Sequence, residues 1–369
     1  MIKTDCKFYE GSKPCSFHKQ DGRLCDSCTD YFPVKFRILL VKLDALGDVL
    51  RTTSILPNLH AKYPGASITW ITKRNALSIL KSNPYVDRVF AIDSNYLEFI
   101  LNEEFDIGIC LDSDSLSSSI LSLARCKTRF GFTANTAGKP IPVNKEAEEW
   151  WLMGVNDKLK TGNRKTYQEI IHNICSLDYK KFPPVINRSI IREDLLKRFI
   201  RDNKIVTGQK IIGINTGGGN RWEWKKWILE SYIDLIRKIK SDLPESQIIL
   251  YGGPEEIEFN QKIMSESGNL VIDAGCRNSL EDFITLVSLC NLFITPDSLG
   301  FHIATALEKN VLVLVGPTSP WELETYGKGE IIFPYMDCIA CYLNKCDKNP
   351  NCMMNIPPDL VMQKIHRYL

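Results

Sequence analysis

The feature that most constrains the fold is a buried-strand pattern that ends in a polar turn and continues as a helix. Residues 38–41 form an unbroken, partly β-branched apolar run, the pattern of a strand that is buried on both faces. Asp44, Gly47 and Asp48 then interrupt the run, and a helical pattern follows from residue 49. Open parallel sheets place their ligand sites at such turns. The turn with its two carboxylates is therefore the first candidate site.

The alternation of strand and helix recurs along the chain and defines the fold class. It predicts α/β architecture, with two parallel sheets that are covered by helices. A cleft between two such domains is the default ligand site. Residues 49–63 are expected to form one helix that Pro57 kinks or whose first turn it limits, and residues 133–163 are expected to be rich in loops. Further strands are predicted at residues 67–72, 86–92, 105–111, 210–215, 247–251, 292–295 and 311–315.

Length and charge exclude several classes of protein. With 369 residues the chain has room for two cores. Its 46 basic and 44 acidic residues leave a formal net charge of +2, which gives no electrostatic reason to expect nucleic-acid binding. The longest apolar runs are too short to span a bilayer, so we expect at most peripheral membrane contact. The first residues hold no apolar signal-peptide core, and we expect a cytoplasmic protein.

Composition divides the chain into four parts. Residues 1–33 are polar and rich in cysteine, and they lack the periodic apolar pattern of a segment that folds by core burial alone. Residues 34–185 and 186–335 are the two predicted α/β domains. Residues 336–369 form a second cysteine-rich segment, with a terminal helix.

A second strand-to-helix turn contains Asp297, Ser298, Gly300 and His302. Backbone N–H groups at a helix start suit a diphosphate, and the small Ser298 and Gly300 allow it to approach closely. An ordinary capped helix explains the same pattern, just as a helix cap explains Asp48.

Two further turns lie between these motifs. Thr216 and Gly217 open a glycine-rich loop that leads to Lys225 and Lys226, and positive charge beside glycines favours a phosphate-bearing ligand. The loop is not a P-loop, because no Gly-Lys-Ser/Thr follows.

The second of these turns ends another predicted strand. It holds Gly253 and Glu255, and a carboxylate at that place can accept hydrogen bonds from ribose hydroxyls. An acidic first helical turn is the alternative explanation.

In chain order, these stretches resemble glycosyltransferase family 9, the heptosyltransferases. The resemblance covers the chain from about residue 36 onward and rests on the segments KLDALGDVLRTTSILPNLHAKYPGASITWIT, KKW, YGGPEE and PDSLGFHIATALEKNVLVLVGPTSP. It implies a GT-B fold, in which two Rossmann-like domains face a central cleft. The acceptor would lie on residues 34–185 and the nucleotide sugar on residues 186–335.

The resemblance also implies roles for single residues. The aspartate of the family's Gly-Asp-Val turn is the general base, which corresponds to Asp48, and a lysine on the donor phosphates corresponds to Lys225. The family's Gly-Pro is Leu299-Gly300 here, and its Lys-Arg-Trp-Pro is KKWI, which leaves the lysine register open by one. The candidate substrate-binding residues are Asp44, Gly47, Thr216, Gly217, Lys226, Gly253, Glu255, Asp297, Ser298, Leu299, Gly300 and His302.

The chemistry of inverting glycosyl transfer fits these residue types. It needs a carboxylate that takes the acceptor's proton and cationic or backbone donors for the departing diphosphate. Lys225 and the helix start at Ser298 supply these cationic and backbone donors without a required Mg²⁺, so we expect no cofactor for catalysis. By resemblance the donor is ADP-heptose, and the acceptor is a lipopolysaccharide sugar, another free or lipid-linked glycan, or a protein.

The thirteen cysteines cluster near both ends of the chain, which favours metal over disulfides in a reducing compartment. Four thiolates can close a tetrahedral site, and a closed site leaves no position for catalysis, so both sites are expected to be structural. Zinc, iron and iron–sulfur clusters all accept such ligands, and scattered unligated thiols are the alternative. By resemblance, a protein-modifying branch of the family binds iron through four cysteines. The two sets are Cys6, Cys15, Cys25 and Cys28, with His18 as a possible substitute, and Cys338, Cys341, Cys346 and Cys352.

Other classes of protein agree with parts of the sequence. A catalytically inactive nucleotide-sugar-binding or scaffold protein with structural metal clusters is the main alternative, and the joint presence of Asp48, Lys225 and Asp297 argues against it. A nicotinamide oxidoreductase is disfavoured, because no Gly-x-Gly-x-x-Gly follows the first strand of either domain. The cysteines also fit a redox-active metalloprotein.

Overall fold

The structure is a computed structural model that describes residues 1–81, 83–218, 223–343 and 345–369. By its internal contacts the chain divides into two compact units. Unit 1 comprises Met1–Asp44, Ile55–Leu152 and Ile171–Lys180, and unit 2 comprises Ala45–Ser54, Met153–Ile170 and Lys181–Leu369. Residues 219–222 of the glycine-rich loop, which carry part of the predicted phosphate-binding pattern, lie outside the described residues.

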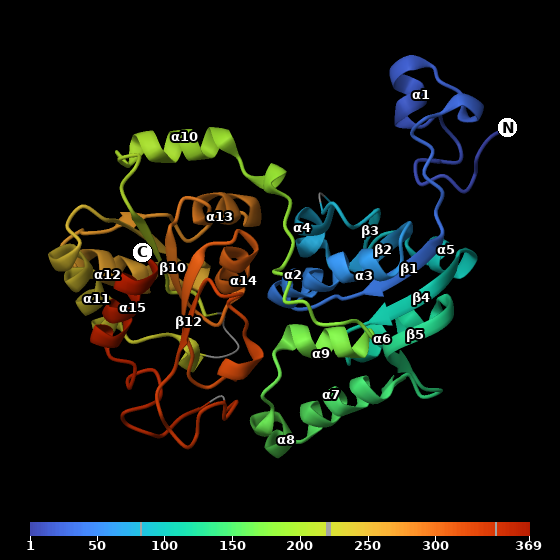
Figure 1. Cartoon of the computed structure of the whole chain (residues 1–369). Coiled ribbons are helices and arrows are strands. Elements are labelled where there is room, and N and C mark those ends of the chain that lie inside the picture. The colour runs from blue at the N-terminus through green and yellow to red at the C-terminus, as the bar shows by residue number, and fades with distance from the viewer. Residues whose placement is uncertain (82, 219–222, 344) are drawn as a thin grey trace. The chain divides into compact units, whose positions relative to one another are not determined.

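Unit 1 contains a six-stranded sheet in the order β3-β2-β1-β4-β5-β6 (Figure 1). All neighbouring strands are parallel except the pair β5 and β6, which is antiparallel. The last four residues of β1 are buried, as the apolar run predicts. The strands are β1 (Phe36–Val41), β2 (Ala66–Thr72), β3 (Arg88–Ala91), β4 (Glu104–Cys110), β5 (Arg125–Ala134) and β6 (Pro140–Pro142). The helices with this sheet are α3 (Leu56–Lys62), α4 (Leu77–Lys81), α5 (Leu97–Asn102) and α6 (Ser115–Leu123).

The switch point of the unit 1 sheet lies between β1 and β4, and a buried ion pair holds it. Lys42 directly follows β1, and its ammonium group contacts the carboxylate of Asp112, which follows β4. The other oxygen of Asp112 accepts the Leu43 N–H at 2.6 Å. Burial raises the pKa of Asp112 against the opposing effect of Lys42. Removal of either partner would leave the other buried charge uncompensated.

Unit 2 contains a parallel six-stranded sheet in the order β12-β11-β10-β7-β8-β9, which is the Rossmann strand order. Helices α11, α12 and α15 lie on one face of this sheet, and α13 and α14 lie on the other (Figure 1). The strands are β7 (Ile211–Asn215), β8 (Gln247–Tyr251), β9 (Ile272–Asp273), β10 (Leu292–Pro296), β11 (Asn310–Leu314) and β12 (Gly329–Ile332). The main helices are α10 (Glu193–Asp202), α11 (Leu229–Asp242), α12 (Ile257–Glu266), α13 (Leu280–Val287), α14 (Leu299–Ala306) and α15 (Pro358–Tyr368).

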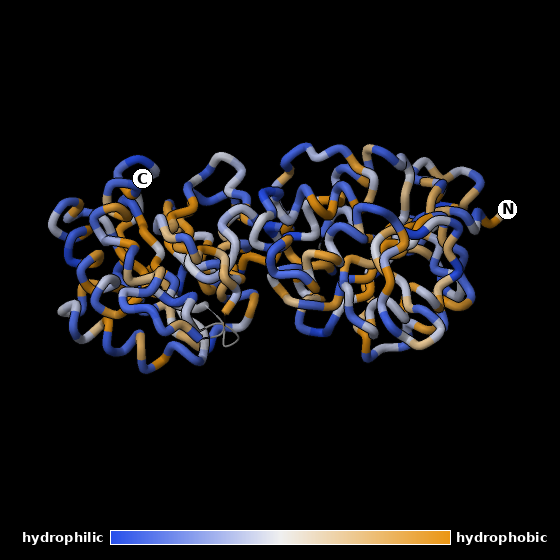
Figure 2. Tube along the Cα trace, turned by 90° about the horizontal axis from the view of Figure 1, so that it is seen from below, coloured by the Kyte–Doolittle hydropathy of each residue, from blue (hydrophilic) through white to orange (hydrophobic). Residues whose placement is uncertain are grey.

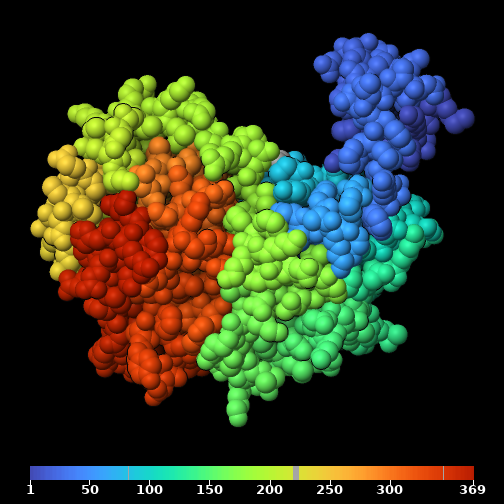
Figure 3. Space-filling model, in the orientation of Figure 1, coloured from blue at the N-terminus to red at the C-terminus, as the bar shows by residue number. Residues whose placement is uncertain are grey.

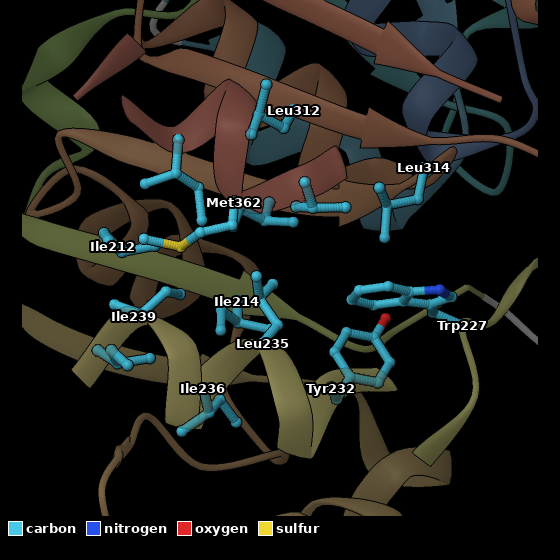
Figure 4. Packing of buried hydrophobic residues seen from close by; sticks show 14 of the residues in the cluster. Ile212, Ile214, Trp227, Tyr232, Leu235, Ile236, Ile239, Leu312, Leu314 and Met362 are labelled. Carbon is cyan, nitrogen blue, oxygen red and sulfur yellow. The ribbon is translucent and has the colours of Figure 1, made fainter. Parts of the chain in front are cut away.

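The core of unit 2 lies between its sheet and helices α11 and α15. Trp227 and Tyr232 pack edge to face at one end of this core, and Met362 of α15 lies over the strands (Figure 4). The buried indole N–H of Trp227 donates to Ile356 O at 3.0 Å, which fixes the chain just beyond Lys225. Hydrophobic segments run through the inside of each unit (Figure 2), and the last residues of the chain cover one side of unit 2 (Figure 3).

The predicted α/β class with two Rossmann-like parallel sheets is confirmed. Two local predictions were wrong. The single helix over residues 49–63 is α2 (Leu46–Thr52), a 3₁₀ turn and α3, because Pro57 has no N–H to continue the helical hydrogen bonds. The loop-rich stretch 133–163 contains α7 (Lys145–Val155) and α8 (Asp157–Gly162). Ala147 is the one residue of these two helices that is fully buried, so core burial left little pattern in this stretch of the sequence.

The division by contacts also differs from the predicted domain bounds. Ala45–Ser54 and Met153–Ile170 were assigned by sequence to residues 34–185 but pack with unit 2. In the second of these segments, Lys160 lies over the ring of Tyr342 at 3.6 Å, and Arg164 lies over that of Trp321 at 3.6 Å. Cation–π contacts therefore help to attach this segment to the later part of the chain.

Candidate functional site

The candidate site in unit 2 begins at the switch point between β7 and β10. Asn215, the last residue of β7, donates to Thr295 Oγ1 at 2.9 Å and to Ser298 Oγ at 3.3 Å. A Cβ atom on Gly300 would lie 2.8 Å from Asn215 Nδ2, so only glycine lets α14 begin this close to β7. The predicted residues Ser298 and Gly300 thus hold the start of α14 at the carboxyl ends of the strands, where ligands bind in such folds.

Asp297 carries a negative charge at the same point. Lys225 Nζ donates to its Oδ2 at 2.8 Å, and Thr318 Oγ1 donates to the same oxygen at 2.8 Å. Burial by itself would raise the pKa of Asp297, but Lys225, His302 and Thr318 together hold it well below its usual range. Lys225 and Asp297, both predicted from sequence, therefore form a charged pair beside the start of α14.

The neighbouring lysine faces a different carboxylate. Lys226 Nζ lies 2.5 Å from Glu256 Oε1, and the other oxygen of Glu256 accepts the Gly253 N–H at 2.9 Å. Glu256 is buried, whereas the predicted residue Glu255 is exposed. The 3₁₀ turn at Pro254–Glu256 directs the third residue, Glu256, back toward the strand end, while the substrate contact of Glu255 stays a prediction.

Thr216, for which a substrate contact is predicted, directly follows β7. Its side chain is fully buried, and its hydroxyl donates to Asn260 Oδ1 at 2.6 Å. Gly217, which follows it, is only partly buried, and a Cβ there would lie 3.3 Å from Glu256 Oε2. Thr216 therefore anchors the loop from inside, while the Gly217 backbone borders the carboxylate.

The helix that carries Asp48 packs on α14. A Cβ on Gly47 would lie 3.0 Å from His302 Cδ2, so Gly47 allows close contact between α2 and α14. Asp48 Oδ1 pairs with Arg51 Nη2 at 2.8 Å, and its Oδ2 accepts the Ala45 N–H at 3.3 Å. Asp48 thus makes the helix-start contact that its position favours, and it also lies in the unit that holds Lys225 and Asp297.

His302 is buried beside these charges and is neutral. Burial, followed by the positive charge of Arg51, lowers the pKa of His302 to about 4, against the opposing effects of Asp297 and Asp48. Within the residues that the structure describes, its Nδ1 atom has no hydrogen-bond partner. A neutral imidazole can donate one hydrogen bond to a substrate but adds no positive charge.

Comparison with known proteins decides the family. Residues 95–350, more than half of the chain, match glycosyltransferase family 9 (heptosyltransferase). The chain belongs to glycosyltransferase family 9. It is therefore a glycosyltransferase, as its sequence motifs predict.

Relatives of this glycosyltransferase cover nearly all of its length. Lipooligosaccharide heptosyltransferase 2 of Haemophilus influenzae is 22% identical over 361 residues, which span 90% of this chain and 99% of the relative. A family 9 glycosyl transferase from Veillonella parvula has a TM-score of 0.71 at 18% identity and covers 90% and 97% of the two chains. An iron-containing dodecameric heptosyltransferase of E. coli, TibC, solved with ADP-D-β-D-heptose, has a TM-score of 0.56 at 12% identity over 91% and 76%. At these identities the structural matches support the GT-B fold alone.

Asp44, the other carboxylate of the turn that follows β1, lies in unit 1 of the glycosyltransferase. Asp44 is exposed, and its side chain pairs with Lys73, while its backbone oxygen accepts from Lys42. Asp44 and Asp48 therefore take different partners in different units, although four positions separate them.

Sequence reasoning missed three residues of this cluster. Arg51 lies three positions after Asp48 and therefore on the same helix face, a spacing that could have pointed to it. Glu256 could have been found as the third residue after a potential helix cap, Gly253. Thr318 lies in a matching stretch of the family but has no local signal, because its contact to Asp297 is long-range.

Among the described residues, the predicted metal-binding cysteines of the glycosyltransferase do not form a complete set of metal ligands. Within residues 1–81, 83–218, 223–343 and 345–369, no group of three or more His, Cys, Asp or Glu side chains is placed to hold a metal ion. All eight thiols are free and partly buried. The four N-terminal ones line a single cavity of about 520 Å³, together with His18. The two metal sites stay predictions.

Among the described residues, no helix is both long and apolar enough to cross a bilayer.

The neutral state of His302 predicts a pH dependence of stability. Because its folded-state pKa of about 4 lies below the ordinary histidine pKa of 6.5, the folded chain binds fewer protons than the unfolded chain between these pH values. This contribution to stability is complete above pH 6.5 and is lost as the pH falls toward 4, by about 3 kcal/mol. The free energy of unfolding in denaturant should therefore fall less between pH 7 and pH 4 for His302→Gln than for the wild type.

The matched control is His366→Gln, at an exposed position of α15, which should lose as much stability as the wild type. An equal loss in His302→Gln and the wild type would contradict the assignment of a buried, neutral His302.

Proposed function

We propose that this glycosyltransferase moves a heptose from a nucleotide-diphosphate sugar to an acceptor hydroxyl with inversion at the anomeric carbon. The observation that carries the proposal is the convergence, within unit 2, of the Lys225–Asp297 pair, the start of α14 and the carboxylate of Asp48. The relatives that match the chain are heptosyltransferases, which supports heptose as the sugar.

The donor diphosphate is proposed to bind at the start of α14. Backbone N–H groups there and the positive end of the helix dipole favour an anion. Lys225 lies next to this point and supplies a cation, since its ammonium group already reaches Asp297 O at 3.3 Å. As the bond to the sugar breaks, negative charge grows on the diphosphate, and fixed donors of this kind stabilise it. The scheme needs no catalytic metal ion.

The transfer itself is proposed as a single displacement. The acceptor oxygen attacks the anomeric carbon while its proton passes to the carboxylate of Asp48. The new bond forms between that oxygen and the anomeric carbon, and the bond from this carbon to the diphosphate oxygen breaks. The nucleoside diphosphate leaves with the electron pair, and Asp48 later releases the proton to solvent. Asp48 is suited to this role because its side chain is 35% exposed, whereas its partner Arg51 is 14% exposed.

The donor is proposed to be ADP-heptose, because a structural neighbour was solved with that compound. Glu256, which lies beside Gly217 and Gly253, is proposed to accept from ribose hydroxyls of such a nucleotide. The acceptor is proposed to be a sugar of lipopolysaccharide, since the relatives are named as lipooligosaccharide or lipopolysaccharide heptosyltransferases. Another glycan or a protein hydroxyl would fit the same chemistry.

Substitution of the base tests the mechanism. Asp48→Asn removes the proton acceptor but keeps the shape of the side chain, so turnover should fall by ~10²–10⁴ with little change in donor binding. Steady-state rates and calorimetric titration with the donor would measure the two effects. Asp93→Asn, an exposed carboxylate in unit 1 that pairs with Arg74, is the matched control. Near-normal turnover in Asp48→Asn would remove this residue from the mechanism.

A thermal-shift screen of ADP-, GDP- and UDP-sugars tests the donor class. A ligand at about 100 times its Kd stabilises the folded state by about 2.7 kcal/mol, and we expect only the ADP-sugar to raise Tm. Lys225→Met should abolish this shift, and Lys226→Met, whose lysine faces Glu256, should reduce it less. If none of the three sugars raised Tm, the chain would not bind these donors, and the result would count against the transferase proposal itself.

We also propose a structural metal in residues 1–33. Helix α1 (Ser16–Asp21) and the 3₁₀ turn at Cys25–Ser27 contain no buried residue, so this segment encloses a cavity where a core would lie. Four thiols around one cavity suit zinc, iron or an iron–sulfur cluster. A second site at the four C-terminal cysteines is proposed on their spacing alone. One structural neighbour is described as iron-containing.

Metal analysis of the purified full chain tests this proposal. For each four-cysteine set we expect about one equivalent of zinc or iron, or about two to four equivalents of iron for an iron–sulfur cluster. The double variant Cys25→Ser/Cys28→Ser should lose the metal of one set and become sensitive to protease within residues 1–33. Cys276→Ser, outside both sets, should keep the full content. A wild-type protein without bound metal when purified under anaerobic, chelator-free conditions would contradict the proposal.

A further inference from the structure

The structure also assigns a role to Arg51, which neither the motifs nor the family match singled out. Its guanidinium is buried and lies with its centre 3.5 Å from the centroid of the Tyr167 ring. A planar guanidinium stacks well on an aromatic face, and a buried charge of this kind needs a compensating partner. That partner is Asp48, which is the proposed catalytic base.

Tyr167 is itself fixed to the helix that carries Asp48. Its hydroxyl lies 2.8 Å from Thr52 Oγ1, and Thr52 Oγ1 donates to the backbone oxygen of Asp48 at 2.6 Å. Because a threonine hydroxyl has one hydrogen, Tyr167 donates to Thr52 in this arrangement. Tyr167 therefore holds α2 at two points, through its ring at Arg51 and through its hydroxyl at Thr52.

These contacts form a closed loop that leads from Asp48 back to Asp48. The side chain of Asp48 is held by Arg51, Arg51 by Tyr167, Tyr167 by Thr52, and Thr52 by the backbone of Asp48. Asp48 Oδ2 also accepts from Ala45 N–H, so both carboxylate oxygens have a fixed donor. A base whose rotamer is fixed loses less entropy when it meets the acceptor hydroxyl.

We propose that Arg51 is a positioning residue that orients the carboxylate of Asp48 and keeps it ionised, and that Tyr167 holds Arg51 in place. The proposal rests on the role of Asp48 proposed above. Arg51 also acts on His302, because its positive charge helps to keep that imidazole neutral. The charged and titratable groups that act on Arg51 and His302 are Asp48, Tyr167, Lys225, Asp297 and Glu322.

The test compares Arg51→Met and Arg51→Lys with the wild type in the full-length protein, using the donor found by thermal shift. For Arg51→Met we expect kcat to fall by ~10–100-fold, because the base is no longer aligned, with donor KM within about twofold. Loss of the neighbouring cation makes Asp48 easier to protonate, so the acidic limb of the pH–rate profile should move up by about one pH unit.

Arg51→Lys separates charge from geometry. It keeps the cation but loses the planar stack on Tyr167, so its acidic limb should stay at the wild-type position while kcat remains below the wild-type value. Arg74→Met, an exposed arginine of unit 1, is the matched control and should behave as the wild type. Melting temperatures and donor affinity show that each variant is folded.

Two outcomes would overturn the proposal. If Asp48→Asn abolishes turnover while Arg51→Met keeps the wild-type kcat and acidic limb, the role of Arg51 is refuted and that of Asp48 stands. If Asp48→Asn keeps normal turnover, the base assignment fails and the role of Arg51 fails with it.

Discussion

The ion pair between Lys225 and Asp297 is the interaction on which the rest of the site depends. Its two side chains are only 14% and 16% exposed, and Thr318 donates to the same carboxylate. Lys225 follows β7, Asp297 follows β10 and Thr318 follows β11, which are three neighbouring strands of one sheet. The pair therefore ties three strand ends together where an anion would bind. Because each buried charge needs the other, a change that removes one side alone disturbs all three loops.

The same buried environment gives each ionisable group a different state. Asp297 stays charged because Lys225, His302 and Thr318 together outweigh the effect of burial on its pKa. His302 is neutral because burial and the charge of Arg51 both lower its pKa. The segment Ala45–Ser54 brings Asp48 and Arg51 into unit 2, where Gly47 packs on His302. The proposed base and the proposed diphosphate site are thus built from one contiguous set of contacts.

The sequence predicted those features of the fold and the site that depend only on residues close together in the chain. Residues 247–251 coincide with β8 because an apolar strand run is visible without tertiary context, and Lys225 and Asp297 follow from residue types at strand ends. Other features depend on contacts between distant residues. Both Glu255 and Glu256 are acidic, and only the turn decides which one is buried. Arg51 has the sequence appearance of a solvated helix residue, and its partner Tyr167 lies more than a hundred positions away.

The stereochemistry of transfer tests the central claim most directly. Proton NMR of the glycoside formed from an ADP-sugar would give the configuration of its new anomeric centre, which as an acetal does not equilibrate. A single displacement with Asp48 as base predicts an inverted configuration relative to the donor. A product that retains the donor configuration would contradict this account, because retention requires a different path at the anomeric carbon.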